Sequence, residues 1–220
     1  MSDTKQFIFG YGSLVESQSR ARTSPTALYA APANVVGVQR GWFDQVGGVS
    51  LSTTYLGAVA DPNSSCNGVI FKVTPQQLNE FDQRETGYQR ERINPNNVTM
   101  FDGSKSAPDG DIWFYANTKK RLASPEFPIV QSYVDICLNG CLEIEATYPL
   151  ARDAAFAETF LKTSTDWSKY WVNDRLYPRR AFIYQPNASK IDQLIVKVLG
   201  KEMFSNIKIE PAIWEKSANA

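Results

Sequence analysis

The segment Phe7-Ile8-Phe9-Gly10-Tyr11-Gly12-Ser13-Leu14 places the strongest constraint on the fold. Its apolar beginning predicts a buried strand, and its two glycines predict a tight turn directly after that strand. Successive backbone N–H groups in such a turn form a concave site that suits an anion or an oxyanion. Gly10 and Gly12 are expected to allow close approach and positive φ. An ordinary turn or β-bulge is the alternative interpretation, and the lysine and spacing of a P-loop are missing.

The 220-residue chain contains no histidine. This excludes Ser–His and Cys–His catalysis and histidine-ligated metals within the chain. A general base must therefore come from Asp, Glu, Lys, Tyr or Cys. The 23 basic and 23 acidic side chains give a formal net charge of zero. Because nucleic-acid-binding proteins usually carry a basic excess, we expect no nucleic-acid partner.

The sequence also lacks the apolar segments that membranes and secretion require. No apolar run reaches about 18 residues, and residues 1–6 have no signal-peptide core. The odd number of cysteines follows no disulfide framework, so we expect a cytoplasmic protein without a membrane partner. Cys137 and Cys141 share a predicted helix face, but no further metal ligands are evident, and buried packing is the preferred interpretation.

Most predicted strands precede most predicted helices. Beyond the first strand, strands are expected at 35–43, 50–59, 69–73, 93–100 and 111–116. Residues 16–25 are expected to form a loop, with a short helical turn within it as the alternative. Asp61-Pro62-Asn63 is predicted to end a strand and Asn67-Gly68 to form a hairpin. Helices are expected from Pro75 to before Gly87 and at 129–144, 151–162 and 191–199. This order favours an α+β fold with a mixed or barrel-like sheet over a regular βαβ winding.

A charged cluster at residues 81–92 follows the first of these helices. Ordinary ion pairs at a solvated helix end are the preferred interpretation for Glu91 and Arg92. Glu85 differs because it lies at the helix exit beside Gly87-Tyr88, where the chain re-enters the sheet. A carboxylate held against aromatic side chains there is expected to have a raised pKa and to be able to shuttle a proton.

Tyr11-Gly12-Ser13-Leu14, followed about seventy residues later by Asp82-x-x-Glu85, resembles the γ-glutamylcyclotransferase superfamily, with its AIG2-like barrel. Supporting residues, in the same order along the chain, are Arg40-Gly41-Trp42, Tyr115, Tyr133 and Gly140. The resemblance covers about residues 7–145. It implies an α+β fold with a mixed β-barrel flanked by helices over residues 1–150. Residues 151–220 are expected to be an appended helical and aromatic extension packed on the same domain.

The resemblance further implies that the glycine turn binds a γ-glutamyl group and that Glu85 is the catalytic general acid/base. The expected substrate-binding residues are Tyr11, Gly12, Ser13, Leu14, Tyr88 and Tyr115. In a γ-glutamyl amide the α-amine can attack the γ-carbonyl and close a five-membered lactam, 5-oxoproline. Such intramolecular attack reaches effective molarities on the order of 10⁵ M when well oriented. No enzyme nucleophile, metal or cofactor is then required.

Other functions stay open at this stage. The same barrel can serve as a non-catalytic small-molecule-binding or interaction module, or transfer the acyl group to another amine. The leaving group is equally open between glutathione, a γ-glutamyl amino acid and a γ-glutamyl amine, as is the oligomeric state. The extension contains a group of aromatic and basic residues that could form a cation–π patch or bind an anionic part of a ligand: Trp167, Trp171, Tyr177, Arg175, Arg179 and Arg180. Ordinary packing against the barrel is the preferred interpretation, and a functional extension is expected to cover the pocket mouth and tune the leaving group.

Overall fold

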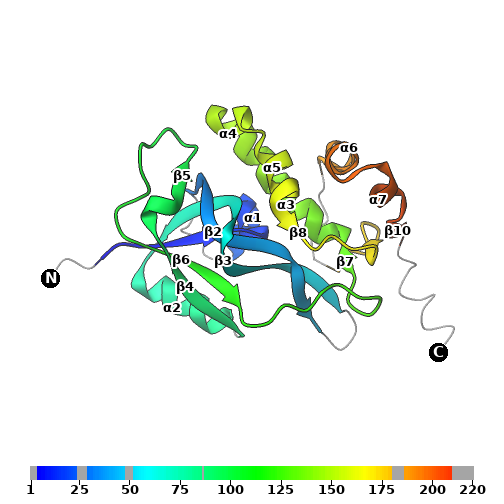
Figure 1. Cartoon of the computed structure of the whole chain (residues 1–220), viewed down its shortest axis with the longest axis horizontal. Coiled ribbons are helices and arrows are strands. Elements are labelled where there is room, and N and C mark those ends of the chain that lie inside the picture. The colour runs from blue at the N-terminus through cyan, green and yellow to red at the C-terminus, as the bar shows by residue number, and fades with distance from the viewer. Residues whose placement is uncertain (1–3, 24–28, 48–51, 86, 180–185, 210–220) are drawn as a thin grey trace.

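The computed structural model describes residues 4–23, 29–47, 52–85, 87–179 and 186–209 (Figure 1). The strands are β1 Gln6–Gly10, β2 Ala31–Val46, β3 Thr53–Val73, β4 Tyr88–Ile93, β5 Val98–Met100, β6 Asp111–Asn117, β7 Ile129–Val130, β8 Ser164–Thr165, β9 Trp171–Asn173 and β10 Lys208–Ile209. The helices are α1 Ser17–Thr23, α2 Pro75–Arg84, α3 Gln131–Thr147, α4 Pro149–Asp153, α5 Phe156–Thr163, α6 Ala188–Leu199 and α7 Lys201–Ser205, with short 3-10 helices η1 Ser13–Val15 and η2 Pro95–Asn97.

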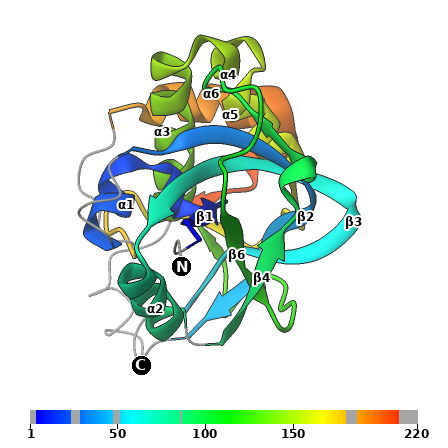
Figure 2. The ribbon, with the colours of Figure 1, turned by 90° about the vertical axis from the view of Figure 1, so that its left-hand side faces the viewer.

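The expected α+β fold with a mixed sheet flanked by helices is confirmed. The strands follow the order β10-β9-β7-β3-β1-β6-β4, and β2 pairs with β3, β5 and β8. Figure 2 shows the sheet curling around the core, with α2 on one side and α3 to α5 on the other. Within the described ranges the sheet does not close into a ring, because the two end strands, β4 and β10, do not pair. None of the described helices combines the length and apolar character needed to cross a membrane.

Strand β1 is an interior strand of the sheet, between β3 and β6. It pairs antiparallel with β3 and parallel with β6. Ile8 and Phe9 are each 1% exposed, as the apolar sequence predicted for a buried strand. The glycine turn follows at the end of this strand, so it leaves the sheet from the middle of the core.

Strand β3 continues through two predicted stops, so the strand end at Asp61-Pro62-Asn63 and the hairpin at Asn67-Gly68 are wrong. The β2–β3 register passes from Val36–Ser65 to Val38–Ala60, which places residues 61–64 opposite Gly37 alone. The Asp61 carboxylate accepts hydrogen bonds from Asn63 N and Ser64 Oγ within this irregularity. Proline is tolerated there because it interrupts no regular ladder hydrogen bond.

Three further predictions differ from the structure. Residues 16–25, predicted as a loop with a short helical turn as the alternative, contain the seven-residue helix α1, and their last two residues lie outside the described ranges. The predicted strand at 93–100 is divided between the end of β4, the 3-10 helix η2 and β5. The predicted helix at 151–162 is two helices, α4 and α5, because the backbone at Ala155 is left-handed, with φ of 48°. The predicted start of α2 is confirmed, with a complete capping box at Thr74 and Gln77.

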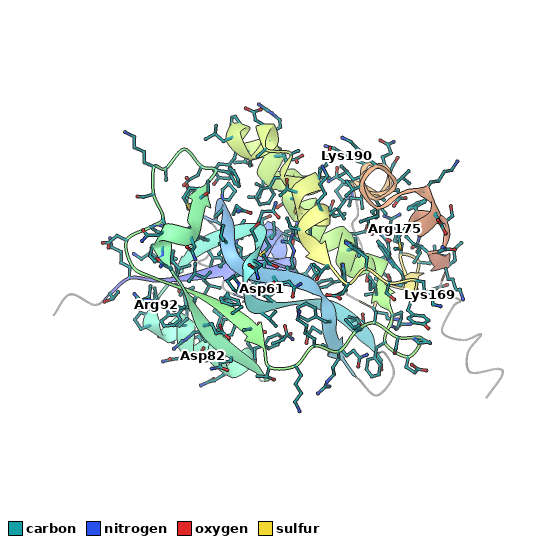
Figure 3. The ribbon with its side chains drawn as sticks, viewed as in Figure 1. Asp61, Asp82, Arg92, Lys169, Arg175 and Lys190 are labelled. Atoms are coloured by element: carbon teal, nitrogen blue, oxygen red, sulfur yellow. The ribbon has the colours of Figure 1, made fainter. Side chains whose placement is uncertain are left out.

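Residues after 150 enter both the core and the sheet. The side chains of Phe156, Phe160 and Trp171 are each 1% exposed, and β8 and β9 pair with β2 and β7. Arg175, labelled beside the C-terminal helices in Figure 3, donates to Asp135 of α3 at 2.7 Å and to Asp192 of α6 at 2.8 Å. These contacts attach the extension to the central helix α3 by a salt bridge that is largely shielded from water.

Candidate active site

The glycine turn and Glu85 line a single cavity of about 160 Å³. Strands β1, β2, β3, β4 and β6 supply its walls together with α3, η1 and the end of α2. The structure brings together every residue proposed from the sequence: Tyr11, Gly12, Ser13, Leu14, Glu85, Tyr88 and Tyr115. No residue of the described part of the extension lines the cavity, so the idea of a cover over the pocket mouth has no support in its geometry.

Within the described ranges, the carbonyl groups of the glycine turn accept hydrogen bonds from the residues that follow, and two of its N–H groups have no protein acceptor. Gly12 O and Ser13 O accept hydrogen bonds from Val15 N at 3.0 Å and Glu16 N at 3.2 Å. In the described ranges, the N–H groups of Ser13 and Leu14 donate to no protein acceptor. Buried or half-buried backbone donors usually have a partner, so these two N–H groups are suited to a ligand oxygen.

Gly12 is required at its position by close packing. A Cβ added to Gly12 would lie 2.7 Å from the Tyr133 hydroxyl oxygen, and one added to Gly10 would lie 2.8 Å from the Leu14 Cβ. The expectation of positive φ at these glycines is wrong: the φ of Gly12 is −124°, and Gly10 is not among the glycines with positive φ. Both glycines serve close approach, because neighbouring side chains leave no room for a methyl group.

Tyrosines form much of the cavity wall. The Tyr11 hydroxyl donates to Tyr115 O at 2.7 Å, and Tyr55 stacks on Tyr133 with ring centroids 4.4 Å apart. The Tyr115 hydroxyl donates to Asp82 Oδ1 at 2.8 Å. Burial is the main cause that raises the pKa of Tyr11, Tyr88 and Tyr115 above the ordinary value. These hydroxyls therefore remain protonated at neutral pH.

Glu85 is the residue that ends α2. Its N–H donates to Phe81 O at 2.8 Å and its carbonyl accepts from Tyr88 N at 3.1 Å, which returns the chain to the sheet. Gly87 has a φ of +101°, a conformation that glycine adopts easily and that allows this reversal. Glu85 lines the same cavity as Tyr11, Tyr88 and Tyr115, and after burial its negative charge is a smaller cause that raises the pKa of these tyrosines. The raised pKa expected for Glu85 itself stays a prediction.

Asp44 is a second carboxylate in the cavity, which the sequence analysis missed. Its Oδ1 accepts from Asn117 Nδ2 at 2.8 Å, and its Oδ2 accepts a short hydrogen bond from the Tyr88 hydroxyl. Burial raises the pKa of Asp44 above its ordinary value, against the effect of these two hydrogen bonds. The sequence contains one signal for this residue: Asp44 directly follows the apolar pair Trp42-Phe43, which the structure shows to be buried in β2.

The cysteines are not arranged as a metal site. Cys66, Cys137 and Cys141 are all buried free thiols, in agreement with the packing interpretation for the helical pair. Among the described residues, no group of three or more Cys, Asp or Glu side chains is placed to hold a metal ion. The cavity therefore offers carboxylates, hydroxyls and backbone donors as its reactive groups.

A family model described as gamma-glutamyl cyclotransferase, AIG2-like, matches residues 8–130 of this sequence. The match spans more than half of the 220 residues and contains both the glycine turn and Glu85. The chain belongs to this family. No curated protein matches the sequence at a significant level.

Two solved structures share the fold. An uncharacterised protein from Homo sapiens superposes with a TM-score of 0.55 at 16% identity, over 76% of this chain and 92% of its own. A protein named gamma-glutamyl cyclotransferase superposes with a TM-score of 0.55 at 14% identity, over 88% of this chain and 99% of its own. At these identities the likeness concerns the fold alone, and the second match extends it into the C-terminal extension.

Proposed function

We propose that this protein cyclises the γ-glutamyl group of a γ-glutamyl peptide or amine to 5-oxoproline and releases the amine. One observation carries the proposal: a cavity of about 160 Å³ is lined by both the glycine turn and Glu85. Family membership supports the reaction class, since the matched region contains both parts. The two parts lie about seventy residues apart in sequence.

In the proposed reaction, Glu85 removes a proton from the α-ammonium group of the substrate. The freed amine attacks the γ-carbonyl carbon, and a C–N bond forms as the carbonyl oxygen takes the negative charge. Glu85 returns its proton to the leaving nitrogen as the original amide C–N bond breaks. The remaining ring-nitrogen proton passes to the released amine, which leaves as an ammonium ion. The enzyme needs no nucleophile of its own, because the attacking amine belongs to the substrate and the cavity only has to hold it next to the γ-carbonyl.

The other groups of the cavity hold the substrate in this proposal. Backbone N–H groups of Ser13 and Leu14 bind an anionic oxygen, and Tyr11 and Tyr115 form the wall beside it. Asp44 holds the Tyr88 hydroxyl, and both of its oxygens already accept hydrogen bonds from protein groups. It is therefore less suited than Glu85 to exchange protons with the substrate.

The full chain is tested with γ-glutamyl amino acids, γ-glutamyl amines and glutathione. We expect 5-oxoproline and free amine in equal amounts from at least one of these compounds. Binding without turnover of any of them would instead indicate a small-molecule-binding module. Transfer of the glutamyl group to an added amine would indicate acyl transfer, and free glutamate would indicate hydrolysis, so each outcome identifies one reaction class.

A further inference from the structure

Arg40 of β2 carries a positive charge into the protein interior. Its side chain is 0% exposed, and a guanidinium remains protonated at all ordinary pH values. Within the described ranges no carboxylate forms an ion pair with it. All of its hydrogen-bond acceptors are neutral oxygens: Ser164 Oγ, Tyr11 O, Asn67 O, Asn67 Oδ1, Phe160 O and Thr163 Oγ1. Buried charges are normally paired, so this arrangement calls for a function.

A second buried arginine on the same turn provides a comparison. Arg20 donates to Leu14 O at 2.8 Å and Val15 O at 3.0 Å, and it is 4% exposed. Burial lowers the pKa of Arg20, and the carboxylates of Glu143 and Glu16 oppose this effect. Burial lowers the pKa of Arg40, and the groups that oppose this effect are three thiols and a tyrosine, namely Cys66, Cys141, Cys137 and Tyr133. These groups are neutral near pH 7. The guanidinium carbon also lies 3.6 Å from the centre of the Phe160 ring, so neutral oxygens and an aromatic ring hold this charge, and no carboxylate of the described residues pairs with it.

This charge lies directly behind the candidate site. Arg40 Nη1 donates to the carbonyl oxygen of Tyr11 at 3.3 Å, and Tyr11 lines the cavity. The guanidinium therefore contacts the backbone of a residue that lines the cavity. Charges in the protein interior are screened much less than surface charges, so this one acts on a ligand in the cavity.

We propose that Arg40 is a positioning residue that selects ligands with a carboxylate at the glycine turn. It acts through its hydrogen bond to Tyr11 O and through its charge, without touching the ligand. This inference rests on the proposed function and deepens it, because it places the α-carboxylate of the γ-glutamyl group at the turn, in preference to the developing oxyanion. A permanent negative charge is present in both ground and transition states, so loss of Arg40 should raise KM more than it lowers kcat.

Wild-type protein supplies the first test, in which the dissociation constants of 5-oxoproline and its neutral carboxamide are measured by calorimetry. We expect the acid to bind at least about tenfold more tightly than the amide. This preference should change less than about twofold between about 0.05 and about 0.5 M salt, because a buried charge is poorly screened. Equal binding of acid and amide, or a preference that disappears in salt, would overturn the inference.

Variants identify Arg40 as the source of the preference. Arg40→Gln removes the charge, and Asn67→Asp neutralises it by placing a carboxylate at an acceptor position. Both should reduce the acid-over-amide ratio by about tenfold, whereas Arg40→Lys should largely retain it. Thr163→Val removes one acceptor but no charge, so it should lower stability and keep the ratio. A folded Arg40→Gln or Asn67→Asp protein with the wild-type ratio would contradict the inference.

The proposed function and this inference fail in different ways. If wild-type protein releases 5-oxoproline but binds acid and amide equally, only the role of Arg40 is contradicted. If wild type prefers the acid, Arg40→Gln loses that preference and no γ-glutamyl compound yields 5-oxoproline, the proposed reaction is contradicted and the role of Arg40 stands. If it binds neither ligand and turns over no substrate, both are contradicted.

Discussion

Gly12 and Tyr133 lie so close together that a Cβ on Gly12 would be 2.7 Å from the tyrosine hydroxyl oxygen. Tyr133 cannot easily move away, because it is 6% exposed, stacks on Tyr55 and contacts the edge of Trp42. The glycine turn is therefore shaped by α3 as well as by its own sequence. Any side chain at Gly12 must displace either the turn or the tyrosine.

The first prediction follows from this contact. Gly12→Ala should raise KM for a γ-glutamyl substrate by tenfold or more and destabilise the protein by about 1–3 kcal/mol through overpacking. Tyr133→Phe removes the oxygen in the predicted clash. The double variant Gly12→Ala/Tyr133→Phe should therefore recover part of the lost stability and affinity in a double-mutant cycle. Strictly additive effects of the two changes would contradict the proposed contact.

Asp44 provides a pH-dependent prediction. Burial raises its pKa above the ordinary value of 3.8, so the folded protein binds this proton more tightly than the unfolded chain does. Its stabilising contribution is thus complete below the ordinary pKa and is lost as the pH rises through the raised pKa. Asp44→Asn has no carboxyl group at this position, so its stability does not fall with pH in this way. The Tm of the variant relative to wild type should increase between about pH 4 and about pH 7. A relative Tm that stays constant or falls would contradict the prediction.

Much of the candidate site could be predicted from local sequence. The apolar residues before Gly10 predicted the central strand, and Thr74 with Gln77 predicted the start of α2 through a capping box that the structure contains. Gly87-Tyr88, where the chain re-enters the sheet, marked Glu85 as the residue at the helix exit. These features depend on residues close in sequence, and local propensities and caps describe such features well.

Other parts depended on distant contacts. Pro62 and Asn67-Gly68 look like strand ends, but pairing with β2 holds β3 together across both. Asp44 becomes a cavity residue only through Asn117 and Tyr88, which lie on β6 and β4. The role of Arg40 depends on acceptors from residues 160–164, more than one hundred positions away. Short motifs do not contain such long-range partners.

The third prediction concerns the extension. Removal of residues 151–220 would leave three acceptors of Arg40 missing, namely Phe160 O, Thr163 Oγ1 and Ser164 Oγ. It would also uncover the apolar surface that Phe156, Trp171 and their neighbours bury. We expect residues 1–150 alone to lack cooperative thermal unfolding and to exchange backbone amides rapidly. Removing hydrogen bonds from a buried charge strongly lowers the free energy of unfolding. A truncated protein with a cooperative transition near the wild-type Tm would show that the extension is dispensable.

The fourth prediction concerns the thiols. Burial raises the pKa of Cys66 to about 11, despite the opposing effect of Arg40. At about pH 8 its thiolate should be about a hundredfold scarcer than that of an ordinary cysteine, and burial further limits access. Cys137 and Cys141 are buried as well. A disulfide reagent should therefore react slowly with native protein and rapidly with all three thiols after denaturation. Rapid reaction of the native protein would contradict the buried placement.

The fifth prediction concerns the acid/base residue. Glu85→Gln preserves the size of the side chain and removes its ability to exchange protons, so kcat should fall about 10²–10⁴-fold. Binding of 5-oxoproline should change little, because the glycine turn is intact. Glu80→Gln changes an exposed glutamate on the same helix and is the matched control, with wild-type activity expected.

The most direct measurement of the central claim is the rate of 5-oxoproline release by wild type, Glu85→Gln and Glu80→Gln on one γ-glutamyl substrate at saturation. Proposed catalysis by Glu85 predicts equal rates for wild type and Glu80→Gln and a rate about 10²–10⁴-fold lower for Glu85→Gln. Release of 5-oxoproline by purified Glu85→Gln at the wild-type rate would contradict it.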